Sequence, residues 1–153
     1  MNDTLNFQYC QKIVLLRNDD SEVLLARRKG EADYDGTYSL IGGKLETTDG
    51  GLVEGLRREK TEEIGPDVQM RICPLLSYNV YFVKKAGNAM VLPHYYAEYQ
   101  SGEIRLNDEY SDYRWVPLAE LAALEPKIAN IPDMVAWAKR IKKVLEPADF
   151  VTI

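Results

Sequence analysis

One acid-rich segment near the middle of the chain constrains the fold most strongly. Within residues 51–64, apolar side chains recur at the spacing of an amphipathic helix. The helix is expected to end at Gly65 and Pro66, because glycine accepts a left-handed cap and proline cannot extend a helix. Strand-like runs lie on both sides, so the fold must place this helix between strands. The apolar positions that set the spacing are Leu52, Leu56 and Ile64.

The other patterns give the order of the remaining elements. A turn-forming sequence at residues 18–21 separates two β-rich runs and predicts a hairpin over residues 11–28. Near the end of the chain, an amphipathic pattern predicts a second helix over residues 131–145. Further strands are expected at residues 37–41, 68–83, 89–106 and, as a last short strand, 113–118, with a turn at residues 84–88.

This order of strands, helix, strands and helix predicts one α+β domain over residues 1–153. Its layers should form an α/β/α sandwich around a mixed β-sheet. The length is sufficient for a single ordinary domain with a sizeable core. The sequence contains neither an internal repeat nor a low-complexity linker that would indicate a second domain.

The charge and hydropathy of the chain limit its partners. The formal net charge is −5 at pH 7, and the Lys and Arg residues are scattered rather than clustered. A polymeric nucleic acid is therefore not expected as a partner, because its binding surface would carry a basic patch. No apolar run approaches the roughly 20 residues needed to cross a bilayer, and the N-terminus lacks the pattern of a secretory signal. The sequence predicts a soluble, cytoplasmic protein that does not associate with a membrane.

Three carboxylates fall on one face of the predicted central helix. Glu59, Glu62 and Glu63 are separated by three and four residues and should project together. Each like-charged pair at this spacing costs roughly 0.2–0.5 kcal/mol, part of which Arg58 can offset. Mg²⁺ and Mn²⁺ prefer hard oxygen ligands, so this face is a candidate site for a divalent metal. The alternative is a solvated acidic face, which is common on helices and supports solubility.

A glycine pair before the helix favours the metal site over a solvated face. Gly42 and Gly43 end a predicted strand, where glycine permits unusual dihedral angles or a close approach of the backbone. A carbonyl exposed there could serve as another hard ligand. A site with two or more ions would allow a metal-activated water to attack a phosphorus atom. Considered alone, the glycine pair is explained equally well by a strand-ending turn.

Together, the glycine pair and the acidic helix resemble a known signature. The sequence GGKLE, followed by a loop and by REKTEEIG within residues 42–65, resembles the Nudix box of hydrolases that act on nucleoside diphosphates linked to another moiety. The order of the strands and the terminal helix is also similar to that family's α/β/α sandwich. The resemblance implies a Nudix-type fold, Mg²⁺ or Mn²⁺ as the cofactor and a small nucleotide as the substrate.

The resemblance also implies a role for each residue of the motif. Glu62 and Glu63 would be metal ligands, and Glu59 would be a ligand or the base that orients the water. Arg58 would be the ion-pair partner that holds the carboxylates, and the carbonyl group of Gly43 would be a further ligand. These five residues form the predicted catalytic and metal-binding set.

The sequence departs from the family pattern at a few positions. Asp49 stands where the pattern has a glutamate, and the spacing from there to Arg58 is one residue longer. The extra residue is expected in the loop at residues 47–51, where an insertion costs little. Lys60 and Pro66 occupy positions that are aliphatic in the family. None of these changes removes a carboxylate, so we expect the site to be active.

Five further residues are candidates for contact with the substrate. Arg28 ends a predicted strand, and the matching position in related pyrophosphohydrolases can contact phosphates; a solvated strand end is the alternative. Tyr38 and Trp115 could line a slot for a stacked base, although packing in the core explains most aromatic residues. Asp108 and Glu109 resemble the family's stretch beside the nucleotide, and Glu109 is the preferred extra carboxylate; a polar turn is the alternative.

Three other residues are expected to have structural roles. Cys10 and Cys73 each lie in an apolar, strand-like run, which favours reduced core thiols over a disulfide. His94 is the only histidine and also lies in an apolar strand context. It is expected to pack rather than to bind zinc, because no second His or Cys is near it in the sequence.

Two classes of function fit these expectations. The first is Mg²⁺-dependent hydrolysis of a phosphoanhydride bond in a nucleoside triphosphate or a related nucleoside diphosphate derivative. The second is a Nudix-fold module that binds a nucleotide without turning it over. Within the enzyme class, ADP-ribose, a nucleotide sugar or a dinucleoside polyphosphate is the alternative substrate. The full set of carboxylates favours the enzyme, and the sequence is compatible with a homodimer without specifying one.

Overall fold

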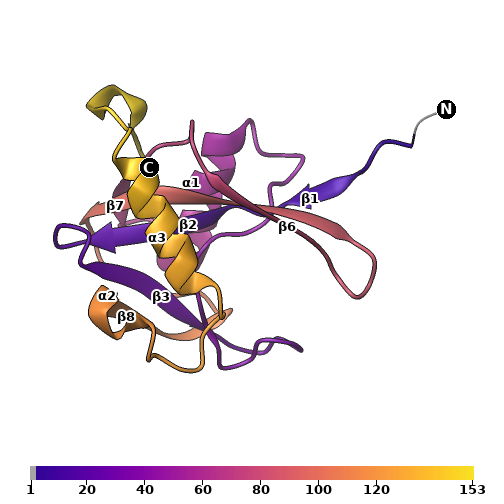
Figure 1. Ribbon diagram of the computed structural model, residues 1–153, viewed down its shortest axis with the longest axis horizontal. Coiled ribbons are helices and arrows are strands. Elements are labelled where there is room, and N and C mark those ends of the chain that lie inside the picture. Colours follow the sequence, from indigo (N-terminus) through magenta and orange to yellow (C-terminus); the bar gives the residue numbers. More distant parts are fainter. Residues whose placement is uncertain (1–2) are drawn as a thin grey trace.

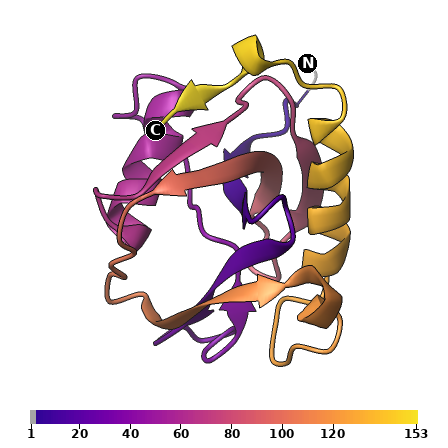
Figure 2. The same ribbon diagram turned by 90° about the vertical axis from the view of Figure 1, so that its left-hand side faces the viewer.

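The computed structural model describes residues 3–153, which form a mixed β-sheet with a helix against each face. Helix α1 (Leu52–Ile64) and helix α3 (Ile131–Lys142) lie on opposite sides of the sheet (Figures 1 and 2). This confirms the predicted α+β class and the α/β/α sandwich. The short helices are α2 (Leu118–Leu121) and the 3-10 helix η1 (Pro147–Asp149). The strands are β1 (Phe7–Tyr9), β2 (Lys12–Arg17), β3 (Glu22–Arg28), β4 (Tyr38–Ser39), β5 (Gln69–Ile72), β6 (Tyr78–Val83), β7 (Ala89–Ser101), β8 (Tyr110–Pro117) and β9 (Val151–Thr152).

Both parallel and antiparallel pairings occur in the sheet. Strands β2 and β3 form the predicted antiparallel hairpin. Residues 18–20 of its turn all have positive φ, a conformation that Asn and Asp tolerate better than most residues. Strand β2 also runs parallel to β7, with Lys12 opposite His94. Strand β8 pairs with β3, while β5 and β6 pair with β7, all of them antiparallel.

The sheet separates two apolar clusters. Along β2, successive side chains point to opposite faces: Ile13 and Leu15 pack on the α1 side, and Val14 and Leu16 pack on the α3 side. All four are fully buried, which explains why this strand reads as a continuous apolar run. Burial of each such side chain contributes roughly 1.5–3 kcal/mol relative to its exposure.

Helix α1 packs through a face that differs in part from the predicted one. Leu56 and Ile64 are buried as expected, whereas Leu52 is exposed. Lys60, which interrupts the apolar pattern, is buried, and its ammonium group donates to the carbonyl oxygen of Val68 at 2.7 Å. The stem of the lysine thus fills a core position while its charge reaches a backbone acceptor. This geometry explains how a lysine occupies a position that is aliphatic in the family pattern.

Several short elements are not predicted from the sequence: β1, α2, η1 and β9. Strand β9 pairs with β5 and follows β8 along the chain, so the strand expected at residues 113–118 is not the last one. It is also longer than expected, because it begins at Tyr110. The run at residues 68–83 is divided into β5 and β6 by a segment that contains Pro74, a residue that cannot donate to a strand ladder.

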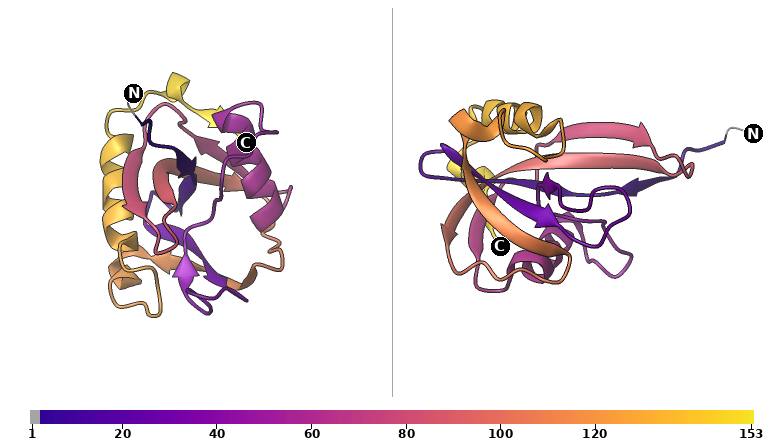
Figure 3. Two further views of the ribbon diagram at one scale, coloured as in Figure 1. Left: turned by 90° about the vertical axis from the view of Figure 1, so that its right-hand side faces the viewer. Right: turned by 90° about the horizontal axis from the view of Figure 1, so that it is seen from below.

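The loop that leads into α1 runs beside the first strand. The N–H group of Leu45 donates to the carbonyl oxygen of Tyr9 at 2.8 Å. Strands β1, β6 and β7 extend together away from the body of the molecule (Figure 1 and right view of Figure 3). Within residues 3–153, none of the helices is both long enough and apolar enough to cross a membrane.

The three residues with predicted structural roles are all buried. Cys10 and Cys73 both lie in the described part of the chain and are buried free thiols. His94 is also buried, and its Nδ1 atom lies 2.9 Å from the carbonyl oxygen of Leu92 and 3.3 Å from that of Tyr78. Burial lowers the pKa of His94 to about 4, so the ring is neutral near neutral pH.

Candidate active site

The backbone at Gly42 and Gly43 leaves no room for side chains. Gly42 has a φ of 123°, and a Cβ atom there would collide with the carbonyl oxygen of Gln11. A Cβ atom at Gly43 would collide with the carboxylate of Glu59. The carbonyl oxygen of Gly43 accepts the N–H group of Gln11 at 2.8 Å. The glycine pair therefore brings the backbone into direct contact with a carboxylate of helix α1.

The three carboxylates of helix α1 form a strip that runs from the interior to the solvent. Glu63 is 3% exposed and Glu59 is 9% exposed, whereas the side chain of Glu62 is 55% exposed. Burial raises the pKa of Glu59 above its ordinary value, although Arg58 acts in the opposite direction. Two of the carboxylates are thus removed from water, and the third remains accessible.

Both oxygens of Glu63 accept a hydrogen bond. The N–H group of Gly42 donates to Oε2 at 2.6 Å, and the hydroxyl of Tyr110 donates to Oε1 at 2.9 Å. Lys12 is nearby, but its ammonium group donates to the carbonyl oxygen of Gly42 at 3.0 Å. Burial raises the pKa of Glu63 to about 7 in spite of these groups. The ion pairs among residues 3–153 do not include Glu63.

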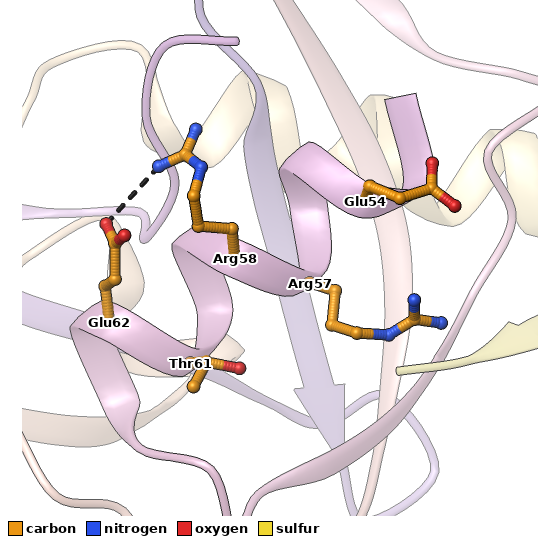
Figure 4. A pocket seen from close by; sticks show the side chains of 5 residues that line it. All are labelled: Glu54, Arg57, Arg58, Thr61 and Glu62. Atoms are coloured by element: carbon orange, nitrogen blue, oxygen red, sulfur yellow. Dashed lines mark hydrogen bonds and ion pairs between the residues drawn. The ribbon is translucent and has the colours of Figure 1, made fainter. Parts of the chain in front are cut away.

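Arg58 forms hydrogen bonds with acidic side chains of both the loop before helix α1 and the helix itself. Its Nε and Nη2 atoms donate to the two oxygens of Asp49 at 2.8 and 2.9 Å, the two-pronged geometry that a guanidinium group favours. Its Nη1 atom donates to Glu59 at 2.9 Å and to Glu62 at 3.3 Å, and the second of these bonds is drawn in Figure 4. Nη2 also donates to the carbonyl oxygen of Lys44 at 2.9 Å. One side chain thus joins the loop to two helix carboxylates.

Asp49 lies where the lengthened loop approaches the helix. Its carboxylate also accepts the N–H group of Glu46 at 2.8 Å. The hydrogen bonds from Arg58, followed by the one from Glu46, lower the pKa of Asp49 to about 2. Aspartate is one methylene shorter than glutamate, and the loop here is one residue longer than the family pattern. The aspartate nevertheless reaches Arg58 with both oxygens.

A shallow hollow of about 380 Å³ lies along the exposed side of helix α1. Its lining includes Arg58 and Glu62, which lie next to each other in Figure 4. This hollow gives solvent access to the outer end of the carboxylate strip. The remaining lining residues are Glu54, Arg57 and Thr61.

The donor groups are of the chemical type that binds a divalent metal, but they do not surround a single point. The carboxylates of Glu59, Glu62 and Glu63 and the carbonyl group of Gly43 are all hard oxygen ligands. The missing side chain at Gly43 is what lets Glu59 reach the backbone. Within residues 3–153, however, no three His, Cys, Asp or Glu side chains lie close enough to form a ready-made metal site. An ion held by all three carboxylates would require one of them to move, and the exposed Glu62 is the least restrained.

Two of the residues predicted to contact the substrate lie near the buried carboxylates. Arg28 ends β3 opposite Tyr110, forms an ion pair with Glu31, and is close enough to Glu63 for the two charges to interact. Its Nε atom is buried without a hydrogen-bond partner in the described part of the chain. Glu109 lies in the loop between β7 and β8. After burial and the charge of Glu62, the charge of Glu109 also raises the pKa of Glu59.

The loop that carries Glu109 docks on the end of helix α1. The N–H group of Arg105 donates to the carbonyl oxygen of Ile64 at 2.9 Å, and that of Asn107 donates to the carbonyl oxygen of Glu63 at 3.3 Å. Asp108 is exposed in the same loop. The loop is therefore fixed to the helix that carries the predicted ligands.

The structure places the two aromatic candidates away from the carboxylates. Tyr38 is buried in the cluster on the α3 side, on the opposite face of the sheet from α1. Trp115 packs on the α1 side, but it lies five residues along β8 from Tyr110, or roughly 15 Å at the rise of a strand. The Cζ atom of Arg17 lies over the Trp115 ring, 4.3 Å from its centroid. The Tyr99 ring packs edge-on against the Trp115 ring, with 5.3 Å between the two centroids. One face of the Trp115 ring is thus already occupied.

Sequence reasoning does not single out three residues that contact the site: Gln11, Lys12 and Tyr110. Gln11 is fully buried, and besides its backbone bond to Gly43 its side-chain amide donates to the carbonyl oxygen of Leu52 at 3.0 Å. Its position just before the apolar run of β2 was the available signal for Gln11. Tyr110 follows Glu109 directly, but a search for charged groups passes over its hydroxyl.

Comparisons with known proteins identify the family of this chain. A family model described as NUDIX domain matches residues 11–138. The nucleoside triphosphatase NudI of Salmonella schwarzengrund (strain CVM19633) is 28% identical over 123 residues, which cover 76% of this chain and 86% of that relative. The chain therefore belongs to the Nudix family and is a hydrolase of the pyrophosphohydrolase type.

Solved structures share the fold over most of their length. The MutT protein from Methanosarcina mazei Go1 is 26% identical and superposes with a TM-score of 0.70, covering 92% of this chain and 99% of that one. The NUDIX domain of Shewanella oneidensis NrtR, solved in complex with ADP ribose, is 22% identical with a TM-score of 0.63, covering 94% and 91%. The NrtR likeness concerns the fold alone.

Proposed function

We propose that this Nudix hydrolase cleaves a phosphoanhydride bond in a nucleoside triphosphate or a related nucleoside diphosphate derivative, with Mg²⁺ or Mn²⁺ as its cofactor. The observation that carries the proposal is the direct contact of Glu59 with the backbone at Gly43, beside a Glu63 that is fixed through both oxygens. The similarity to a nucleoside triphosphatase at 28% identity supports the choice of substrate class.

In this proposal, the residues of helix α1 hold the ion. Glu59, Glu62, Glu63 and the carbonyl group of Gly43 are its ligands. A bound divalent ion would neutralise phosphate charge and lower the pKa of the water that attacks phosphorus. Arg58 orients Glu59 through its bond at 2.9 Å. Because Glu59 and Glu63 are shielded from water, their charges act more strongly than they would in solvent.

Two residues near the carboxylates are proposed to contact the substrate. The guanidinium group of Arg28 suits phosphate oxygens, and its Nε atom has no partner among the described residues. Glu109, with Asp108 beside it, is proposed to face the nucleotide from the loop that docks on α1. Trp115 could stack on a base only if Arg17 left its ring. Tyr38 is not part of this proposal, because it packs on the other face of the sheet.

Product analysis by chromatography tests the proposal. The protein is incubated with Mg²⁺ and a panel of nucleoside triphosphates, oxidised guanine nucleotides, ADP-ribose, nucleotide sugars and dinucleoside polyphosphates. Glu63→Gln serves as the control, because it removes the charge of Glu63 and keeps its shape. We expect turnover of a nucleoside triphosphate by the wild type and a loss of turnover in the control.

The same experiment separates the alternatives. Preferred turnover of ADP-ribose, a nucleotide sugar or a dinucleoside polyphosphate would contradict the proposed substrate class and keep the chemistry. Binding of a nucleotide without turnover of any panel member would contradict the proposed enzyme and favour a binding module. Turnover that persists unchanged in Glu63→Gln would contradict the role proposed for helix α1.

A further inference from the structure

A β-bulge in β8 turns Tyr110 toward the predicted ligands. Side chains alternate along a strand, so continuing from Trp115 on the α1 side would place Ser111 on that side and Tyr110 on the other. The register with β3 shifts just before Arg28, which pairs with Tyr110 and leaves Ser111 as the extra residue. Tyr110 consequently packs in the cluster on the α1 side. Bulges commonly re-aim a side chain in this way next to a functional site.

The hydroxyl group of Tyr110, which this bulge turns toward helix α1, is the second hydrogen-bond donor to the Glu63 carboxylate. The carboxylate plane of a glutamate rotates freely, because the torsion that turns it has a broad energy profile. Here Gly42 holds one oxygen at 2.6 Å, and Tyr110 holds the other at 2.9 Å. Two donors on two different oxygens fix the plane. Each oxygen retains a second lone pair, so both bonds are compatible with an ion bound to the same carboxylate.

We propose that Tyr110 is a positioning residue that holds the Glu63 carboxylate in the orientation in which it binds the divalent ion. This inference rests on the proposed function, because it assumes that Glu63 is a metal ligand. Outer partners that orient a ligand typically change metal affinity by about 10–100-fold when they are removed. The role belongs to the hydroxyl rather than to the ring, which packs in the core in either case.

The chain contains a matched control for the loss of such a hydroxyl. Tyr96 lies on the α3 side of the sheet, is fully buried, and also donates to carboxylates: to Asp20 at 2.7 Å and to Glu98 at 2.9 Å. Tyr110→Phe and Tyr96→Phe therefore remove the same group from two buried sites. Each is expected to lower the free energy of unfolding by about 1 kcal/mol. They should differ in metal binding.

The test measures Mn²⁺ binding to metal-free protein by electron paramagnetic resonance, which reports free Mn²⁺. We expect Tyr110→Phe to bind Mn²⁺ at least about tenfold more weakly than the wild type, and Tyr96→Phe to bind it equally well. In hydrolysis assays, Tyr110→Phe should need about tenfold more Mg²⁺ for half of its maximal rate, and saturating Mg²⁺ should restore that rate. Urea unfolding of both variants verifies that they are folded and lose similar stability.

The outcomes separate this inference from the function on which it rests. If the wild type binds Mn²⁺ and hydrolyses nucleotides while Tyr110→Phe binds Mn²⁺ equally well, the positioning role is wrong and the proposed function stands. If both hydroxyl variants bind Mn²⁺ more weakly, the effect is one of general stability, and the positioning role is again wrong. If the wild type binds no Mn²⁺, the proposed metal site fails, and the role of Tyr110 fails with it.

Discussion

The carboxylates on the two faces of the sheet differ in their charged partners. On the α3 side, Tyr96 donates to Asp20 and to Glu98, and each of these acids also has a basic partner. Lys142 pairs with Asp20, and Arg71 pairs with Glu98 at 2.8 Å. These charges are neutralised by side chains of the chain itself, and the network links a hairpin turn, two strands and helix α3.

On the α1 side, a tyrosine hydroxyl again donates to a carboxylate, but Lys12 and Arg28, the basic groups nearby, form no ion pair with it in the described part of the chain. Tyr110 donates to Glu63, which belongs to none of the ion pairs within residues 3–153. Arg58 is shared by four acids, two in the loop and two on helix α1, and forms no ion pair with Glu63. A buried carboxylate outside any ion pair reduces stability, and a divalent ion from solution would supply a compensating charge. The α3 side therefore favours stability, whereas the α1 side fits the proposed binding of an ion.

The largest effect is expected from Glu63→Gln. Hydrolysis should fall by about 1,000-fold, which corresponds to about 4 kcal/mol of transition-state stabilisation lost with a metal ligand. The free energy of unfolding should not fall, because the substitution removes a buried charge that has no paired cation. Steady-state kinetics at the Mg²⁺ concentration that saturates the wild type and urea unfolding without metal measure the two quantities. A marked loss of stability would show that Glu63 is compensated after all, and the contrast between the faces would disappear.

The lowered pKa of His94 should make the stability of the protein depend on pH. Its pKa is about 4 in the fold and about 6.5 in the unfolded chain, so the unfolded state binds more protons between these values. Its contribution is complete above the unfolded pKa and is lost as the pH falls toward 4, by up to about 3 kcal/mol. Urea unfolding of the wild type and of His94→Gln across this range measures it. Equal pH dependence in both proteins would show that His94 is not the cause.

Asp20→Asn, on the α3 side, should have the opposite effect to Glu63→Gln: a loss of stability without a loss of hydrolysis. The substitution breaks the ion pair with Lys142 and should lower the free energy of unfolding by about 2 kcal/mol, while hydrolysis is retained. Asparagine tolerates the φ of 57° at this position, so the turn itself is preserved. Asp19→Asn, an exposed neighbour in the same turn, is the matched control and should have little effect. Equal destabilisation by both substitutions would place the cause in the turn rather than in the ion pair.

The smallest effect is expected from Asp49→Asn. The substitution removes the two-pronged partner of Arg58 and leaves only the longer loop contact with Glu46 at 3.6 Å, so Arg58 should engage Glu59 and Glu62 more strongly and compete with the ion. The Mg²⁺ concentration that gives half of the maximal rate should rise about tenfold. Asp67→Asn, which removes an exposed carboxylate 3.4 Å from Arg105, is the control and should leave this concentration unchanged. A wild-type Mg²⁺ requirement in Asp49→Asn would show that the loop does not restrain Arg58 for metal binding.

Local patterns predict the elements that local interactions determine. The hairpin turn at residues 18–20 and the helix that ends at Gly65 both follow from the preferences of neighbouring residues. Leu52 is a different case, because its exposure depends on what lies across from the helix rather than on its spacing. The strip of carboxylates is likewise recognisable from spacing, but the depth of each carboxylate is not.

Pairing between distant segments determines what the sequence does not reveal. The bulge that turns Tyr110 arises from the register between β3 and β8, whose residues are more than 80 positions apart. The strands β1 and β9 are too short to be predicted from their own residues, and they pair with β7 and β5. The contact of Gln11 with Gly43 is also a consequence of long-range packing. The outer parts of the site could therefore be found only in the folded chain.

In the proposed function, a divalent ion compensates the buried charge of Glu63 on the α1 side. Urea unfolding with and without Mg²⁺ is the most direct test of this compensation. A ligand that binds only the folded state stabilises it by about 2.7 kcal/mol at a concentration of about 100 times its Kd. Mg²⁺ should stabilise the wild type and Asp20→Asn by the same amount and should not stabilise Glu63→Gln. Equal stabilisation of Glu63→Gln, or none of the wild type, would contradict the assignment of a divalent metal to this face.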